Sequence, residues 1–295
     1  MNKKFNFNRY KMVICQDIAY SWKQYISKIA IVAILLSFIA ICGLYKVQDM
    51  NVAYVGGGRY IDPIQGLMTQ TMVPNIIIIC TVVFFIAAAS IFQNMKSKGQ
   101  RINFLTLPAS NLEKYLAQMT CVTIVAAIML AIAVVVSDFI QFIFSIFMTP
   151  GHHASELLAL FSFAADRIKD FGENEVCPMN HIIPDKYLLV LFFGSWAVWT
   201  HSFLVLGGSL YRKNPTLLSI ISLIIIIALG GYICNFFAHI NWGGDELWEH
   251  LLNVYHCAFL LAASIAIIII SAFNYWASYK IFTRMQVICN KWINI

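Results

Sequence analysis

Three side chains inside the apolar blocks of this sequence have the types that hydrolysis uses: an acid at Asp138, a base at His201 and a hydroxyl at Ser264. A hydrolase working inside a membrane would need such groups at one depth and in a recognisable motif. These three share no motif. Asp138 lies about 21 residues, or roughly 31 Å of helix, beyond the inner edge of its block, so we expect a solvated carboxylate near the outer interface. The sequence therefore predicts a protein that is not an enzyme and has no catalytic residues.

Metal and phosphate sites are equally poorly supported. His152, His153 and Glu156 have the side chains of metal ligands, but adjacent histidines do not share a helix face, and no further ligand has a recognisable spacing. The triple glycine in "VGGGRYIDP" (55–63) lacks the Lys-Ser/Thr pair that completes a phosphate-binding loop. We therefore expect no metal and no cofactor in this chain, and any energy it uses must come from a partner.

The composition shows which elements must position these residues. Of the 295 residues, 60% are hydrophobic and 12% are charged, against about 25% charged in a soluble domain. Each apolar block is near or above the roughly 20 residues that cross a bilayer as a helix, and none alternates as a membrane β-strand does. The prediction is an all-α, polytopic membrane protein with six spans. These spans are 29–45, 72–92, 117–147, 187–210, 216–237 and 254–279.

The basic residues predict the orientation of these spans. If the N-terminus is cytoplasmic, the inside segments carry 15 of the 20 lysines and arginines, and the outside segments carry 11 of the 14 acidic residues. This bias predicts that both termini are cytoplasmic. The net charge of +6 is spread over four loops and not gathered on one face, so we expect no nucleic-acid partner.

Residues 1–28 have the pattern of an amphipathic helix. Tyr10, Ile14, Ile18, Trp22 and Ile26 recur at a spacing of four, with polar and basic residues between them. We expect this helix to lie in the cytoplasmic interface of the bilayer before the six-helix domain, 29–295. Packing of the same helix on a soluble partner is the alternative.

Two further short helices are predicted on the outside. Within the largest outside loop, 148–186, residues 155–170 are expected to form a short helix over the outer face. The segment 238–253 is broken by glycines and is expected to form a helix in the outer interface, just before the last span.

The inside loop 93–116 has the most informative local pattern. "RINFLTLP" (101–108) predicts a short amphipathic helix that Pro108 ends. Ser110 and Glu113 have the spacing of a capping box, which predicts that a new helix starts at Asn111 and continues into the third span. From 111 to 147 this helix would be about 55 Å long, so it must project from the bilayer or break. A simple connector would need none of these features. The loop therefore predicts a rigid ledge under the membrane, whose exposed basic and polar groups dock a partner.

The pattern "FLTLPASNLEKYL" (104–116), between the second and third of six spans, resembles the membrane subunits of ATP-binding-cassette transporters of the second, exporter-type class. The resemblance implies a permease that dimerises with a second permease subunit, as a homo- or heterodimer. It also implies a multi-pass protein of the bacterial cytoplasmic (inner) membrane with its N-terminus inside. The larger outside loop departs from the compact members of that family.

In such transporters a separate ATP-binding-cassette ATPase subunit binds ATP and Mg, and its movements reach the permease through a coupling element. The resemblance places that element at 96–114. The residues expected to couple to the ATPase are Lys96, Lys98, Arg101, Phe104, Leu105, Leu107, Pro108, Ser110, Glu113 and Lys114. The alternative is a non-transporting membrane anchor or sensor that recruits a cytosolic partner through 93–116.

Overall fold

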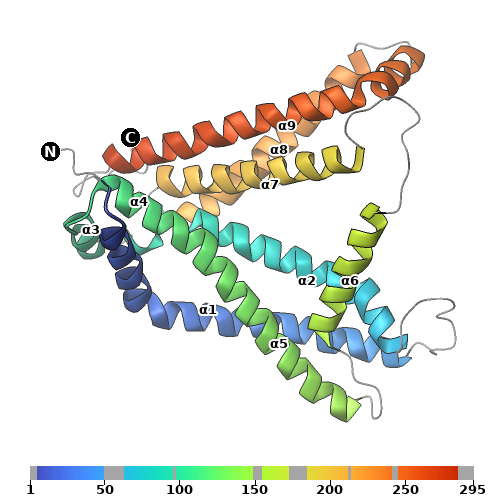
Figure 1. Cartoon of the computed structure of the whole chain (residues 1–295), viewed down its shortest axis with the longest axis horizontal. Coiled ribbons are helices and arrows are strands. Elements are labelled where there is room, and N and C mark those ends of the chain that lie inside the picture. Colours follow the sequence, from blue (N-terminus) through green and yellow to red (C-terminus); the bar gives the residue numbers. More distant parts are fainter. Residues whose placement is uncertain are drawn as a thin grey trace. The chain divides into compact units, whose positions relative to one another are not determined.

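The computed structural model describes residues 5–49, 63–95, 98–148, 155–172, 185–211, 214–240 and 245–284. Their regular elements are helical (Figure 1). In chain order these elements are α1 (Phe7–Asp49), α2 (Pro63–Ala89), η2 (Gln93–Met95), α3 (Lys98–Leu105), α4 (Asn111–Thr120), η3 (Cys121–Val125), α5 (Ala126–Met148), α6 (Glu156–Gly172), α7 (Asp185–Leu210), α8 (Pro215–Ile240) and α9 (Asp245–Arg284).

Six helical segments of this part of the chain are long and apolar enough to cross a membrane. They are Phe7–Gly43, Met72–Met95, Asn111–Phe147, Tyr187–Leu210, Pro215–Ile233 and Leu260–Arg284. Each contains or largely overlaps one of the six predicted spans. The prediction of an all-helical, multi-pass membrane protein is therefore confirmed.

The third of these segments contains a change of helix type. α4 passes into a π-helical turn, η3, and then into α5. The long predicted helix thus starts where the capping box placed it, at Asn111. A π turn widens the helix locally and changes the face that the following residues present.

Contacts within the chain divide it into two compact units. Unit 1 comprises Met1–Ile14, Phe85–Val122 and Glu175–Ile295, and unit 2 comprises Cys15–Phe84 and Thr123–Asn174. Three boundaries fall inside α1, inside α2 and inside the π turn, and the fourth, between residues 174 and 175, lies outside the described residues.

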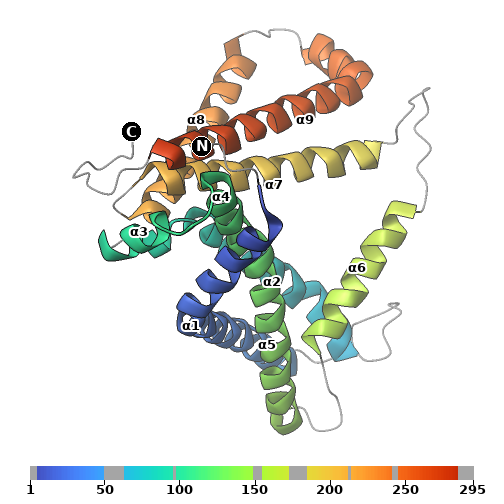
Figure 2. The same ribbon diagram turned by 60° about the vertical axis from the view of Figure 1, so that its left-hand side comes forward.

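In unit 1, α7 packs against both α8 and α9, as two views show (Figures 1 and 2). A core of aromatic side chains joins α9 to the elements around α4. The rings of Phe92 and Phe282 stack with their centroids 5.2 Å apart, and the rings of Tyr115 and Tyr279 meet edge to face at 5.4 Å. Such aromatic pairs stabilise a fold by more than the burial of their surface area alone would give.

Two glycines of α7 allow close approach of neighbouring backbones. A Cβ atom at Gly207 would lie 2.4 Å from Oγ of Ser219 on α8, and one at Gly208 would lie 2.6 Å from the carbonyl oxygen of Ala89. Small residues at helix contacts let backbones pack closely inside a bilayer. Gly230 and Gly231 of α8 have no atom within 4 Å of the corresponding position, so they serve no such contact within the described residues.

Unit 2 has a separate apolar core. Val32, Ala33 and Leu36 of α1 pack there with Ile76 of α2 and with Ala133 and Val134 of α5. Leu157 and Leu160 of α6 pack against the same core. α6 was predicted over residues 155–170 and is observed at Glu156–Gly172.

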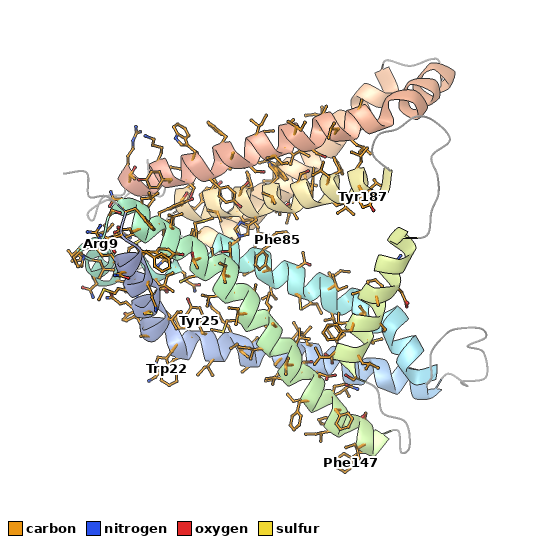
Figure 3. The ribbon with its side chains drawn as sticks, in the orientation of Figure 1. Arg9, Trp22, Tyr25, Phe85, Phe147 and Tyr187 are labelled. Atoms are coloured by element: carbon orange, nitrogen blue, oxygen red, sulfur yellow. The ribbon has the colours of Figure 1, made fainter. Side chains whose placement is uncertain are left out.

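The N-terminal helix differs from the prediction in one respect. α1 continues through residue 28 without a break, because no glycine or proline occurs between Phe7 and Cys42. Trp22 and Ile26 of the predicted apolar stripe are exposed on the protein, and Figure 3 shows Trp22 projecting outward from α1.

The helix expected at 238–253 is not separate either. α9 runs without interruption from Asp245 to Arg284 and therefore includes the second half of that segment. Residues 241–244 lie outside the described part of the chain.

Candidate functional site

The candidate site is the ledge formed by α3, the turn 106–110 and α4, all within unit 1. α3 has a buried and an exposed face, but Arg101 belongs to the buried face and Ile102 to the exposed one. Phe104 is buried and its ring meets that of Phe282 edge to face at 6.4 Å. Arg101 is also buried, and its Nη2 donates a hydrogen bond to the carbonyl oxygen of Met95 at 3.2 Å. The arginine thus binds back onto η2, the element that precedes α3.

The end of α3 is held by a side chain from the next helix. Lys114 is buried, and its Nζ donates a hydrogen bond to the carbonyl oxygen of Leu105 at 2.7 Å. An ammonium group at the C-terminus of a helix satisfies an orphan carbonyl and interacts favourably with the helix dipole. The turn itself is closed by backbone hydrogen bonds from Thr106 to Ile102 and from Ala109 to Leu107. α3 is therefore fixed at both of its ends.

The predicted capping box is present at the start of α4. The Glu113 N–H donates to Oγ of Ser110 at 3.2 Å, and the Ser110 N–H donates to Oε2 of Glu113 at 2.7 Å. Two backbone N–H groups at the helix start are satisfied in this reciprocal way. The box sets where the third span begins.

Glu113 also binds the N-terminus of the chain through its other oxygen. Oε1 accepts a hydrogen bond from the Asn6 N–H at 2.7 Å and from Nη2 of Arg9 at 2.9 Å. Asn6 immediately precedes α1, and its side chain accepts a hydrogen bond from the Asn8 N–H. The carboxylate therefore lies at the N-terminal ends of α1 and α4, where both helix dipoles favour a negative charge. Figure 3 shows Arg9 at this corner.

Further contacts fix α4 in unit 1. The hydroxyl groups of Tyr10 and Thr120 lie within hydrogen-bonding distance at 2.5 Å, and the Tyr115 hydroxyl donates to the backbone oxygen of Tyr275 at 3.2 Å. α4 is thus bonded to α1 on one side and to α9 on the other.

The outward surface of the ledge is mostly uncharged. Its exposed residues between Gly99 and Leu116 are Gly99, Ile102, Asn103, Thr106, Pro108, Asn111, Leu112 and Leu116. On α3, Ile102, Asn103 and Thr106 share one face, opposite the buried Arg101 and Phe104. We call these three residues and Pro108 the α3 face.

The structure shows that the predicted site residues differ in exposure. Pro108 alone of the described ones is exposed. Arg101 does not present its charge outward as predicted, and Glu113 and Lys114 are buried too. The half-buried members are Leu105, Leu107 and Ser110. Lys96 and the side chain of Lys98 lie outside the described residues.

Sequence reasoning missed Asn6 and Arg9, because the partner, Glu113, is more than 100 residues away in the chain. It also missed Ile102, Asn103 and Thr106 as the outward set. The helical period from the buried Phe104 was the signal that could have identified them.

Other candidates for chemistry acquire structural roles. Asp138 accepts hydrogen bonds from Ser155 and from the N–H of Glu156, at the start of α6. Nδ1 of His201 and the Tyr275 hydroxyl lie 2.8 Å apart, and Ser264 donates to the backbone oxygen of Leu260. His152 and His153 lie outside the described residues, among which no group of three potential metal ligands gathers.

Comparisons of the chain with models of protein families, with curated proteins and with solved structures find no match.

Proposed function

We propose that this chain is the membrane subunit of an ATP-driven transporter, resembling the exporter-type class of ATP-binding-cassette permeases. In this proposal a separate ATPase subunit docks on the α3 face, and the chain pairs with a second permease subunit. Both termini are cytoplasmic, in line with the distribution of basic residues.

One observation supports the proposal most strongly: α3 is a preformed element fastened to the start of the third span. Arg101 fastens its beginning, Lys114 fastens its end, and the capping box joins the turn to α4. A partner that pushes on α3 would therefore move the span, because the loop between them would bend little. A flexible connector would not transmit such a push.

The rigidity explains how ATP could be used by a chain that does not bind it. Closure of two ATPase subunits on ATP and Mg would displace the α3 face, and the third span would follow. The buried charged residues keep the ledge rigid, so that it passes the displacement on to the third span. The uncharged α3 face makes the contact with the ATPase.

The test is purification of the tagged full chain from its native membranes. We expect an ATPase with a phosphate-binding loop to co-purify with the wild type. Ile102→Asp together with Thr106→Arg should abolish that association, because both substitutions put charge on the outward face and leave the hydrogen bonds of Arg101, Glu113 and Lys114 in place.

Leu158→Asp is the matched control, since Leu158 is an exposed leucine on α6. It should retain the ATPase. Recovery of a cytosolic protein that is not an ATPase, lost in the α3 variant, would contradict transport and favour a membrane anchor or sensor.

A further inference from the structure

A buried carboxyl group lies in unit 2, where α6 begins beside α5. The Asp138 carboxylate of α5 caps the first turn of α6 by accepting hydrogen bonds from Ser155 and from the N–H of Glu156. This cap places the Glu156 side chain against Ser137 of α5, the residue that precedes Asp138 in the chain. Figure 2 shows α6 and α5 from a second side.

Glu156 has no exposed surface, and the hydroxyl group of Ser137 supplies its side-chain hydrogen bond. Oγ of Ser137 lies 3.2 Å from Oε1 and 3.1 Å from Oε2. No ion pair to Glu156 occurs within the described residues. One hydroxyl group replaces only a small part of the hydration that an ionised carboxylate has in water.

Within the described part of the chain, the neighbouring elements offer no compensating positive charge. α5 presents the carboxylate of Asp138, and α2 presents the thiol of Cys80, which interacts electrostatically with Glu156. α1 contributes the hydroxyl of Ser37, 3.3 Å from that of Ser137. The N-terminus of α6 favours a negative charge, but its first N–H groups already bond Asp138.

A second buried polar group lies on the same face of α5. Gln141 follows Ser137 by one helical turn and has no exposed surface. Neither its amide nitrogen nor its amide oxygen has a hydrogen-bond partner in the described part of the chain. An unsatisfied buried amide is costly in a packed core. This face of α5 therefore carries an amide donor and an amide acceptor that the described contacts between the helices do not satisfy.

We propose that Glu156 is a proton-binding site: the protonated carboxyl group holds the first turn of α6 in the core of unit 2, and loss of the proton releases α6 from α5. The step transfers one proton between the carboxyl group and solvent, and no other bond changes. The ligand is the proton itself. This inference does not depend on the proposed function.

The energetics agree with this geometry. Burial raises the pKa of Glu156 to about 7, and the nearby Asp138 charge adds to this effect while the Ser137 hydrogen bond opposes it. A carboxyl group with such a pKa changes its charge within the physiological range.

Difference infrared spectroscopy on the purified full chain in lipid nanodiscs tests proton binding directly. We expect a band of a protonated, buried carboxyl group that disappears with a midpoint near pH 7. It should be absent from Glu156→Gln and unchanged in Asp166→Asn, which removes a carboxyl group from the same helix. In Ser137→Ala the midpoint should move to higher pH, because the hydrogen bond that favours the ionised form is lost. Ionisation of Glu156 throughout the range from pH 5.5 to 8, or a band that persists in Glu156→Gln, would overturn the proposal.

Amide hydrogen exchange in residues 157–160 tests the release of α6. After correction for the intrinsic effect of pH on exchange, the wild type should lose at least tenfold in protection between pH 6 and pH 8. Glu156→Gln should stay protected at both values, and Asp166→Asn should behave as the wild type does. Equal protection of the wild type at both pH values would overturn the release of α6.

Discussion

Glu113 is the residue on which the ledge depends most. Its two oxygens serve the starts of α1 and α4 and the guanidinium group of Arg9, and its side chain is fully buried. A hydrogen bond to a charged group contributes about 1.5–3 kcal/mol, so the loss of several at once is a large fraction of the stability of a typical domain.

We therefore expect Glu113→Ala to lower the free energy of unfolding by about 2–4 kcal/mol, since it also leaves buried N–H groups unsatisfied. Arg9→Ala should cost less, about 1 kcal/mol, because the Arg9 side chain is 30% exposed and water screens its charge. Denaturation of both single variants and of the double variant measures the coupling between the two residues. Additive effects would show that the ion pair in the structure contributes nothing to stability.

At the scale of elements, the glycines of α7 and α8 offer a matched comparison. A Cβ atom at Gly208 would meet the backbone oxygen of Ala89 at 2.6 Å, whereas one at Gly230 would have no atom of the described residues within 4 Å. Overpacking of a tight contact typically costs about 1–3 kcal/mol. Alanine in place of an uncrowded helical glycine gains about 0.5–1 kcal/mol.

Gly208→Ala should accordingly lower the midpoint of thermal unfolding in a fixed detergent, and Gly230→Ala should leave it unchanged or raise it. A similar shift in both variants would show that helix propensity, and not close packing, determines the outcome at Gly208.

Local signals account for the elements that the sequence predicts well. The six spans follow from runs of apolar residues, and the start of α4 follows from the three-residue spacing of Ser110 and Glu113. Both depend on short-range interactions that a linear pattern contains. The continuity of α1 was missed because its interfacial part was expected to end at residue 28. No helix-breaking residue occurs there, so the helix continues.

The site was only partly predictable because the partners of its charged residues depend on how the elements meet in space. Arg101 and Lys114 look like surface charges in a polar loop, yet Arg101 binds a backbone carbonyl of η2 and Lys114 binds one of α3. The pairing of Arg9 with Glu113, and that of Ser137 with Glu156, depend on how helices meet. No periodicity within one helix encodes such pairings.

For the whole molecule, the central proposal is that an ATPase subunit binds the α3 face. Asn103 is exposed at the middle of that face, and its replacement leaves the buried hydrogen bonds of the ledge intact. A photoreactive amino acid at Asn103, activated in native membranes, reports directly on what contacts α3. We expect a cross-link to an ATPase with a phosphate-binding loop, and no such product from the same probe at Leu158 on α6. The absence of an ATPase among the products from Asn103, or equal cross-linking from both positions, would contradict the proposal.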